Sequence, residues 1–280
     1  MKWFLPLTAT IAIAFTGPTP AQAQGWKLVW SDEFDRAGAP DPAKWGHEHG
    51  FVRNGEKQFY TRDRRENARV EDGHLIIEAR KEPWKEGEKK ADYTSASLTT
   101  EGKHAWTHAK VEVRAKLPKG RGTWPAIWML GSDIHRAGWP ACGEIDIMEF
   151  VGYDPGLVHA NIHTKKYNHV NKNGKGSSLK LPDASEQFHV YGVEWDATKM
   201  DFSVDGKVYF TYKNEGSGTA AWPYDRPQFL ILNLAIGGGW GGQKGIDDAI
   251  FPQRYLIDYV RIYQKADTAT PSQAGRGVRR

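Results

Sequence analysis

The feature that most constrains the fold is a two-residue alternation of apolar and polar side chains along much of the chain. It is clearest in residues 74–79, 110–115, 202–205 and 256–263, where β-branched and aromatic residues predominate. Turn signals separate these segments, and Asp205-Gly206 between two alternating runs is typical of a β-hairpin. We find no long apolar stripe at helical spacing and no internal repeat. The pattern predicts an all-β fold, an antiparallel sandwich with long loops.

The two ends of the chain lack this alternation. Residues 1–23 begin with Lys2, continue with a mostly apolar stretch and end in Ala21-Gln22-Ala23, which predicts a cleaved secretory signal peptide. The apolar stretch is shorter than the roughly 20 residues of a membrane span; the alternative is a buried N-terminal helix. Residues 265–280 predict a disordered basic tail. We therefore expect one globular domain, residues 24–264, secreted to the periplasm or the medium and not attached to a membrane once the signal is removed.

Charge and cysteine content exclude several classes of function. Lys2 and the terminal run of residues 265–280, with four basic residues and one acidic, account for the whole formal net charge of +4. The neutral domain offers no electrostatic reason to bind nucleic acid. Because Cys142 is the single cysteine, the chain can form neither an internal disulfide framework nor a zinc site with several cysteines.

A glycine-rich segment, residues 237–242, formally matches the dinucleotide-binding pattern GxGxxG. Such a site also needs a helix immediately afterwards, whose N-terminus holds the pyrophosphate. Residues 243–252 have no helical pattern. We interpret the segment as a tight loop that displays Trp240.

Three carboxylates gather in residues 144–149, with no lysine or arginine among them. A half-exposed strand with a solvated acidic face is the alternative explanation of Glu144 and Asp146. In a regular strand, however, Glu149 would point away from the other two acids and into the apolar core, where an unpaired charge is costly. One extra residue, a β-bulge at Ile147 or Met148, would return Glu149 to the face of Glu144 and Asp146.

The outer pair, Glu144 and Glu149, would then suit the chemistry of retaining glycosidases. Those enzymes hold two carboxyl groups about 5–5.5 Å apart, one to attack the anomeric carbon and one to protonate the leaving oxygen and later deprotonate water. The two pKa values must differ. A hydrogen bond between Asp146 and Glu144 is one means of arranging this difference.

This segment resembles the Glu-x-Asp-x-x-Glu active-site strand of glycoside hydrolase family 16, in the branch with the extra bulge residue. The resemblance extends from Trp26 to Gln264 and is greatest in residues 29–34, 54–61, 113–118, 124–131, 138–140 and 231–238. These segments are similar to those of bacterial laminarinases, which are endo-β-1,3-glucanases. The resemblance implies a jelly-roll sandwich of two curved antiparallel sheets with an open cleft on the concave face. It also implies that Glu144 is the nucleophile, Glu149 the acid/base and Asp146 the assisting acid, without a cofactor for catalysis.

A glucan cleft needs aromatic platforms for the apolar faces of sugars and hydrogen-bonding groups for their hydroxyls. Residue parity places Trp124 and Trp128 on one strand face, and Trp139 lies close before Glu144. Each tryptophan has a core position as its alternative, most of all Trp124. By resemblance, the polar positions that face the cleft are Asn54, Asn161, His163 and Asn233. The chain has Trp240-Gly241-Gly242 where many relatives have Trp-Pro-Gly, which leaves cleft width and linkage preference near Trp240 open.

The resemblance also implies a structural calcium ion on the convex side of the sandwich. Its ligands would be the Glu33 and Asp258 side chains and the Gly73 carbonyl, and oxygen ligands of this kind suit calcium. Asp258 lies amid apolar residues of a predicted strand, where a carboxylate needs a partner. A salt bridge or simple exposure is the alternative.

We therefore expect a secreted, monomeric endo-hydrolase of laminarin-type β-1,3-glucan that works by retaining double displacement. Two alternatives stay open. The first keeps the chemistry but acts on mixed-linkage β-1,3-1,4-glucan or an algal galactan. The second is a non-catalytic glucan-recognition module, which has no need of both outer glutamates.

Overall fold

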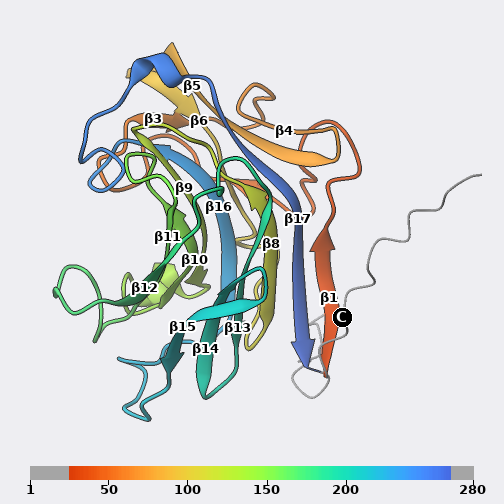
Figure 1. Ribbon diagram of the computed structural model, residues 1–280, viewed down its shortest axis with the longest axis vertical. Helices are drawn as coiled ribbons and strands as arrows, with labels where there is room; N and C mark the ends of the chain where they lie inside the picture. Colours follow the sequence, from red (N-terminus) through yellow and green to blue (C-terminus); the bar gives the residue numbers. More distant parts are fainter. Residues whose placement is uncertain (1–24, 266–280) are drawn as a thin grey trace, which may run out of the picture.

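The computed structural model describes residues 25–265, which form two stacked sheets joined by long loops (Figure 1). The arrangement confirms the predicted all-β sandwich, and all four alternating segments named above lie in strands or run from a strand into its turn. Two short helical turns, α1 (Ile134–Ala137) and η1 (Asp248–Ile250), interrupt the loops. None of the described helices is long and apolar enough to span a membrane. The predicted signal peptide and all of the predicted tail except Lys265 lie outside the described residues.

The ten-stranded sheet, here called the back sheet, has the order β15-β14-β13-β8-β17-β5-β6-β3, and β1 and β4 add to β17 and β5. Its pairs are antiparallel except for β3 with β6. Its strands are β1 (Trp26–Asp32), β3 (Gln58–Tyr60), β4 (Ala68–Glu71), β5 (His74–Glu86), β6 (Lys89–Ser95), β8 (Lys110–Lys116), β13 (His189–Trp195), β14 (Lys199–Val204), β15 (Lys207–Lys213) and β17 (Gln253–Lys265).

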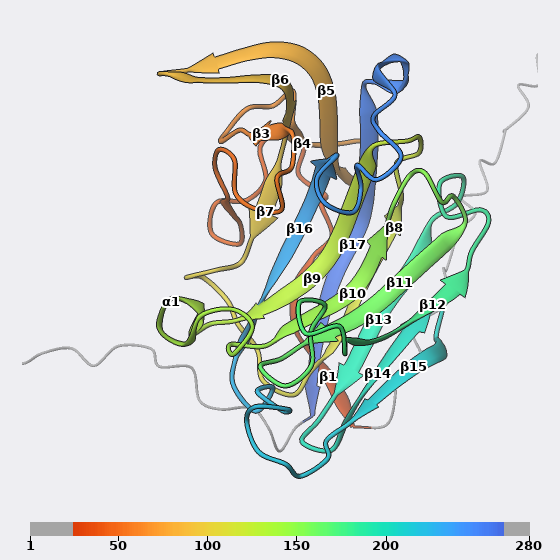
Figure 2. The ribbon, with the colours of Figure 1, turned by 90° about the vertical axis from the view of Figure 1, so that its left-hand side faces the viewer.

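The seven-stranded sheet, here called the cleft sheet, has the order β12-β11-β10-β9-β16-β7-β2 and is antiparallel (Figure 2). Its strands are β2 (Gly46–His47), β7 (Ser97–Thr99), β9 (Thr123–Gly131), β10 (Glu144–Phe150), β11 (Leu157–His163), β12 (Lys175–Lys180) and β16 (Gln228–Ile236).

The main core lies between the two sheets, and the alternation in the sequence produces it. In β8 and β11 every second side chain is buried, and the intervening residues are partly exposed on the opposite face. Strand β16 differs because all nine of its residues are buried. On its second face, Phe229 and Ile231 belong to a smaller apolar cluster with Trp128, Leu130 and Cys142. The same face of the cleft sheet carries the site described next.

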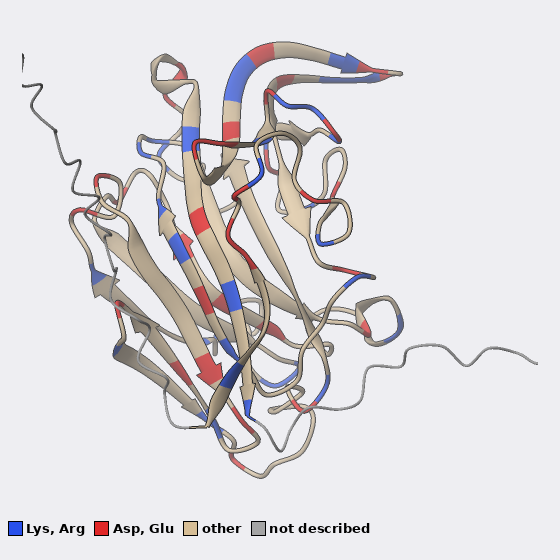
Figure 3. Ribbon diagram, turned by 90° about the vertical axis from the view of Figure 1, so that its right-hand side faces the viewer, with Lys and Arg blue, Asp and Glu red and all other residues tan. Residues whose placement is uncertain are grey.

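Acidic and basic residues follow one another along β5, β8 and β17 of the back sheet (Figure 3). Opposite charges on neighbouring strands pair there, as the ion pair between Arg114 and Asp258 illustrates. The cleft sheet carries its charges differently, since acids are gathered in its middle.

Candidate active site

Strand β10 contains the irregularity that the sequence predicts. Asp146 lies opposite Trp128 of β9, whereas Met148, two residues later, lies opposite Ile127, one residue earlier. The pairing with β11 shifts in the same place, between Asp146 and Glu149. The side chains of Ile147 and Met148 are both buried in the core between the sheets. The β-bulge at these two residues is therefore confirmed.

The bulge brings the three acids to one face. Glu144, Asp146 and Glu149 lie opposite residues 130, 128 and 126 of β9, and opposite residues 163, 161 and 159 of β11. Both partner series advance in steps of two, so all three acids share the face that points away from the core. They line a cleft with a volume of about 810 Å³. All eleven residues predicted for catalysis or substrate binding line this same cleft: Asn54, Trp124, Trp128, Trp139, Glu144, Asp146, Glu149, Asn161, His163, Asn233 and Trp240.

Glu144 is held at one end of the trio. The indole of Trp139 donates a hydrogen bond of 2.6 Å to Glu144 Oε2. His163 Nε2 lies 3.8 Å from Glu144 Oε1 and 3.3 Å from Asp146 Oδ2. Beneath them, the hydroxyl of Tyr224 donates to the backbone carbonyl of Glu144 and so ties the start of β10 to the fold. The side chain of Trp139 is 39% exposed, which leaves its ring available to a ligand.

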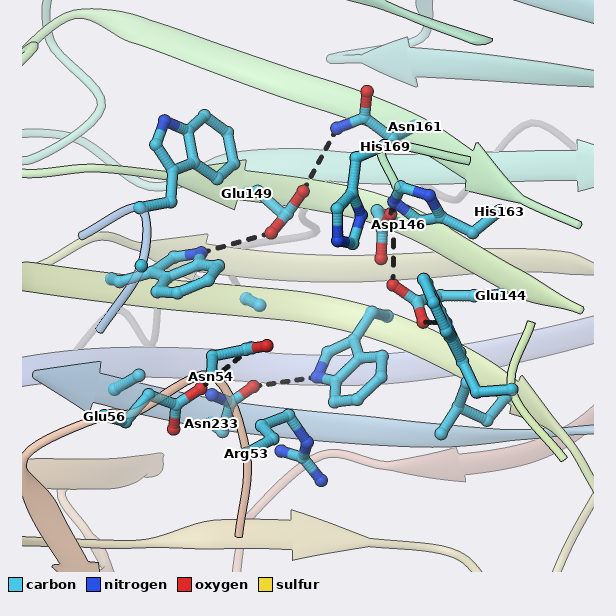
Figure 4. A pocket seen from close by; sticks show the side chains of 18 of the residues that line it. Arg53, Asn54, Glu56, Glu144, Asp146, Glu149, Asn161, His163, His169 and Asn233 are labelled. Carbon is cyan, nitrogen blue, oxygen red and sulfur yellow. Dashed lines mark hydrogen bonds and ion pairs between the residues drawn. The ribbon is translucent and has the colours of Figure 1, made fainter. Parts of the chain in front are cut away.

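Glu149 is held at the other end by two neutral donors (Figure 4). Trp124 Nε1 donates to one carboxylate oxygen and Asn161 Nδ2 to the other, both at 3.1 Å. Trp124 in turn contacts Trp240, with ring centroids 5.7 Å apart, and Trp240 contacts His159. The glycine-rich loop therefore does display Trp240 in the cleft, on the Glu149 side of the trio.

Burial and mutual repulsion raise the pKa of every acid in the trio. Burial, and next the negative charge of Asp146, raise the pKa of Glu144 to about 8, while the nearby His163 and the indole of Trp139 act in the opposite direction. Burial and the charge of Glu144 raise the pKa of Glu149 to about 7. The pKa of Asp146 is raised well above its usual range by burial and by the charge of Glu149.

Glu144 and Asp146 lie on the same face of β10, and the negative charge of Asp146 raises the pKa of Glu144. Ionisation of both carboxyls at once is therefore disfavoured, and one proton between them relieves the repulsion. Glu144 already accepts from Trp139, whereas Asp146 is the more deeply buried of the two, with a side chain 3% exposed against 16%. A proton on Asp146 would remove the charge that most opposes ionisation of Glu144.

Trp128 lies in the cleft but is not an open stacking platform. Its side chain is 7% exposed, and the guanidinium of Arg53 lies 4.7 Å from the ring centroid. Its Nε1 donates a 2.8 Å hydrogen bond to Asn233 Oδ1. Arg53 is fixed in turn by an ion pair with Glu48. The Trp128 ring thus forms part of the wall, and the more accessible rings are those of Trp124, Trp139 and Trp240.

Four polar residues of the cleft were not expected from the sequence: Arg53, Glu56, His169 and Gln243. His169 contacts Trp139, with ring centroids 5.3 Å apart, and its pKa is lowered by loss of solvent and by the charge of His163. Glu56 carries a detectable signal, because polar side chains at 56, 58 and 60 alternate as they would along one face of an extended segment. For Arg53, His169 and Gln243 we find no such signal.

The residues predicted to bind calcium are arranged as ion pairs. Arg261 donates to both carboxylate oxygens of Glu33, at 3.0 and 2.8 Å. Arg114 donates to Asp258 at 2.6 Å, and His74 lies 3.7 Å from the same carboxylate. A calcium ion would need both carboxylates to leave their arginines, so the residues in this arrangement do not fit the ion. These ion pairs match the salt bridge that the sequence analysis gives as the alternative to a calcium site, and calcium binding stays a prediction.

Comparison with known proteins agrees with the geometry. Residues 55–261 match the family model described as glycosyl hydrolases family 16. The chain is 50% identical over 253 residues to a β-glucanase of Rhodothermus marinus, with 87% of each chain covered. The X-ray structure of the laminarinase from Rhodothermus marinus matches with a TM-score of 0.83 and 49% identity, over 86% of this chain and 98% of that chain. SCLam, described as a non-specific endo-β-1,3(4)-glucanase, matches with a TM-score of 0.82 and 48% identity, over 86% and 92% of the two chains.

Proposed function

Since the chain belongs to glycoside hydrolase family 16, we propose that it is an endo-acting hydrolase of laminarin-type β-1,3-glucan that works with retention of configuration. The observation that carries the proposal is the bulge in β10. It turns Glu149 out of the core and into the cleft beside Glu144 and Asp146. A strand built only to support the sandwich has no need of three acids on one face, each with a raised pKa.

Glu144 is the nucleophile in this proposal. With Asp146 protonated, Glu144 ionises more readily, and the indole of Trp139 keeps one of its oxygens in place, so that the Glu144 carboxylate attacks the anomeric carbon of the bound sugar. The glycosidic bond breaks as the new bond to Glu144 forms. His163, near both acids, balances part of their charge.

Glu149 is the acid and base. With a pKa of about 7 it holds a proton in mildly acidic to neutral solution and gives it to the departing glycosidic oxygen. It then becomes a carboxylate, which Trp124 and Asn161 stabilise with one hydrogen bond each. As a carboxylate it takes a proton from the water that releases the sugar from Glu144, and this restores the starting state.

The position of the aromatic rings supports endo action. Trp139 and His169 lie on the Glu144 side of the trio, and Trp124 and Trp240 on the Glu149 side. Sugar-binding groups therefore flank the reacting position in both directions, as cleavage within a long chain requires. The similar SCLam is described as non-specific for β-1,3(4) linkages, which is the reason to keep mixed-linkage glucan as the second candidate substrate.

The experiment that tests the function is a comparison of substrates. Reducing-sugar release from laminarin, lichenan and agarose should be fastest with laminarin and produce oligosaccharides from the start. Faster release from lichenan or agarose would move the proposal to mixed-linkage glucan or galactan. No release from any of the three would refute the hydrolase and leave the glucan-recognition alternative.

Export belongs to the same proposal and rests on the sequence of residues 1–23. Protein recovered from the periplasm or medium of an expressing bacterium should begin at Gln24. Mass spectrometry that finds the full chain retained in the cytoplasm would contradict this.

A further inference from the structure

Glu56 is a buried acid in the wall of the cleft opposite the trio (Figure 4). It is 7% exposed, and burial raises its pKa. Three neutral side chains donate hydrogen bonds to its carboxylate: Asn54 Nδ2 at 3.1 Å, Gln58 Nε2 at 2.7 Å and the hydroxyl of Tyr60 at 3.3 Å. None of the catalytic roles proposed above involves this carboxylate.

An ionised carboxylate only accepts hydrogen bonds, so it fixes the direction of every bond around it. The amide of Asn54 must turn its nitrogen toward Glu56, and its oxygen remains for a ligand in the cleft. Tyr60 has one hydroxyl proton, which it gives to Glu56, and its oxygen must therefore accept. It accepts from Asn233 Nδ2 at 2.9 Å.

The same constraint applies to the next hydrogen bonds, which connect Tyr60 through Asn233 to Trp128 at the floor of the cleft. Because the nitrogen of Asn233 points at Tyr60, its oxygen must face the other way, where it accepts the 2.8 Å bond from Trp128 Nε1. The indole nitrogen can only donate, so the two ends of the chain agree. The hydrogen bonds are therefore all donated in one direction, from Trp128 to Asn233, from Asn233 to Tyr60 and from Tyr60 to Glu56. The direction is fixed because Trp128 can only donate and Glu56 can only accept.

We propose that Glu56 is a positioning residue for the substrate, which sets how the amides of Asn54 and Asn233 face a β-glucan in the cleft. It touches no reacting atom. Its charge presents the Asn54 oxygen as an acceptor for a sugar hydroxyl and holds Asn233 and the Trp128 ring at the cleft floor. The inference rests on the proposed function, since it names the ligand as a β-glucan chain.

The backbone around Glu56 is held independently of its carboxylate. Lys57 N donates to Ile236 O at 2.8 Å, Gly239 N donates to Asn54 O at 3.0 Å, and Glu56 forms a backbone bridge with Gly237. Replacement of Glu56 by glutamine, which has the same shape, should therefore leave the segment in place. Glutamine offers a donor where the carboxylate only accepted, so at least one of the three donors loses its partner and the amide directions are no longer fixed.

The test separates binding from turnover. In a Glu144→Gln background, calorimetry should show that Glu56→Gln weakens binding of laminarihexaose at least tenfold. With Glu144 intact, Glu56→Gln should raise KM by a similar factor, change kcat less than threefold and leave both limbs of the pH profile in place. Tyr60→Phe, which cuts only the branch to Asn233, should weaken binding by a smaller factor of about three to five.

Glu78→Gln is the matched control, because Glu78 is a buried carboxylate of the back sheet, 2% exposed and remote from the cleft. It should lower the melting temperature and leave KM unchanged. Binding by Glu56→Gln within twofold of its parent would overturn the inference, as would an equal rise in KM for Glu78→Gln. Should Glu56→Gln fail to fold, Tyr60→Phe decides, and unchanged binding would overturn it. Failure of the wild-type protein to hydrolyse any glucan is a different result, which refutes the proposed function instead.

Discussion

Asp146 and Glu78 are equally buried carboxylates, each 2% exposed, but the charged groups around them are of opposite sign in the two sheets. Glu78 of the back sheet is surrounded by Arg69, Arg80 and Arg254, each with a hydrogen bond to its carboxylate. Asp146 of the cleft sheet has two further acids as neighbours, and His163 is the one basic group recorded at ion-pair distance within the described chain.

The difference separates stability from reactivity. Arginines around a buried carboxylate keep it ionised and fixed, which stabilises the fold but leaves it inert. Acids around a buried carboxylate repel it when they are ionised, which lowers the stability of the fold. The same repulsion raises their pKa values toward neutral pH, where they can donate and accept protons during a reaction. The two arrangements lie on neighbouring layers of one sandwich. The comparison therefore predicts that the same substitution, carboxylate to amide, has opposite consequences in the two sheets.

The largest effect is expected on turnover. Glu144→Gln and Glu149→Gln should each lower kcat on laminarin by about 10³-fold or more, because one removes the proposed nucleophile and the other the proposed acid and base. Binding of laminarin should remain nearly intact. Glu78→Gln should hydrolyse laminarin at the wild-type rate. Near-wild-type turnover by either cleft variant would refute the assigned roles.

The stability of the fold should respond in the opposite way, with a loss expected for the substitution in the back sheet. Glu78→Gln removes the negative charge that three arginines share and replaces one of its two acceptor oxygens with a donor. The partial exposure of Arg80 and Arg254 allows water to replace part of the loss. We expect the free energy of unfolding to fall by about 1–3 kcal/mol. Thermal or urea denaturation measures this, and an unchanged midpoint would show that the arginine cluster contributes no stability.

Glu144→Gln should instead stabilise the protein, most of all in alkaline solution. The pKa of Glu144 is about 8 in the folded state against its usual value of 4.5, so the folded state binds the proton more tightly and wild-type stability falls as pH rises between these values. Glutamine cannot ionise, and its advantage should grow from near zero at pH 4 to on the order of 5 kcal/mol at pH 9. Denaturation of both proteins at several pH values checks this; a constant or negative difference would contradict it.

A smaller effect is expected from the hydrogen bond of Trp124. Its indole donates to Glu149 and lowers the pKa of that acid, so Trp124→Phe should raise the pKa. The alkaline limb of the kcat profile, where Glu149 loses its proton, should then move upward by about one pH unit or less. Trp240→Phe removes a neighbouring indole with no recorded bond to Glu149 and should leave the limb in place. Equal movement in both variants would show that ring packing, not the hydrogen bond, is responsible.

The smallest effect is expected from calcium. Glu33 and Asp258 are paired with Arg261 and Arg114, so neither carboxylate is free to bind an ion. Addition of calcium or EDTA should change the melting temperature by less than about 1 °C, whereas loss of a site held at saturating calcium would change it by several degrees. A large calcium-dependent rise would restore the family-based prediction.

Much of the fold and the trio follows from the sequence because local rules determine them. The alternation defines the strands, and the cost of placing Glu149 in the core requires the bulge that β10 has. Cleft membership of the aromatic and amide residues follows from strand parity together with resemblance. These features depend on which face of a strand a residue occupies, and a sequence records this directly.

What the sequence does not reveal depends on contacts between distant segments. The guanidinium of Arg53 covers the ring of Trp128, which is 75 positions later in the sequence. The ring is therefore not open for a sugar to stack on, contrary to what the sequence predicts. Arg261 and Arg114 meet Glu33 and Asp258 only because β1, β8 and β17 are neighbours in the back sheet. Each of these pairings depends on sheet order and side-chain direction, neither of which a local pattern records.

The account depends most on Glu144 and Glu149 acting together on one glycosidic bond. Proton NMR of laminarin hydrolysis in its first minutes, before the anomers interconvert, tests this directly. Two successive displacements at the same carbon predict that the β-anomer of the new reducing end appears first. An α-anomer as the first product would mean that water attacks directly, and Glu144 would then not be the nucleophile.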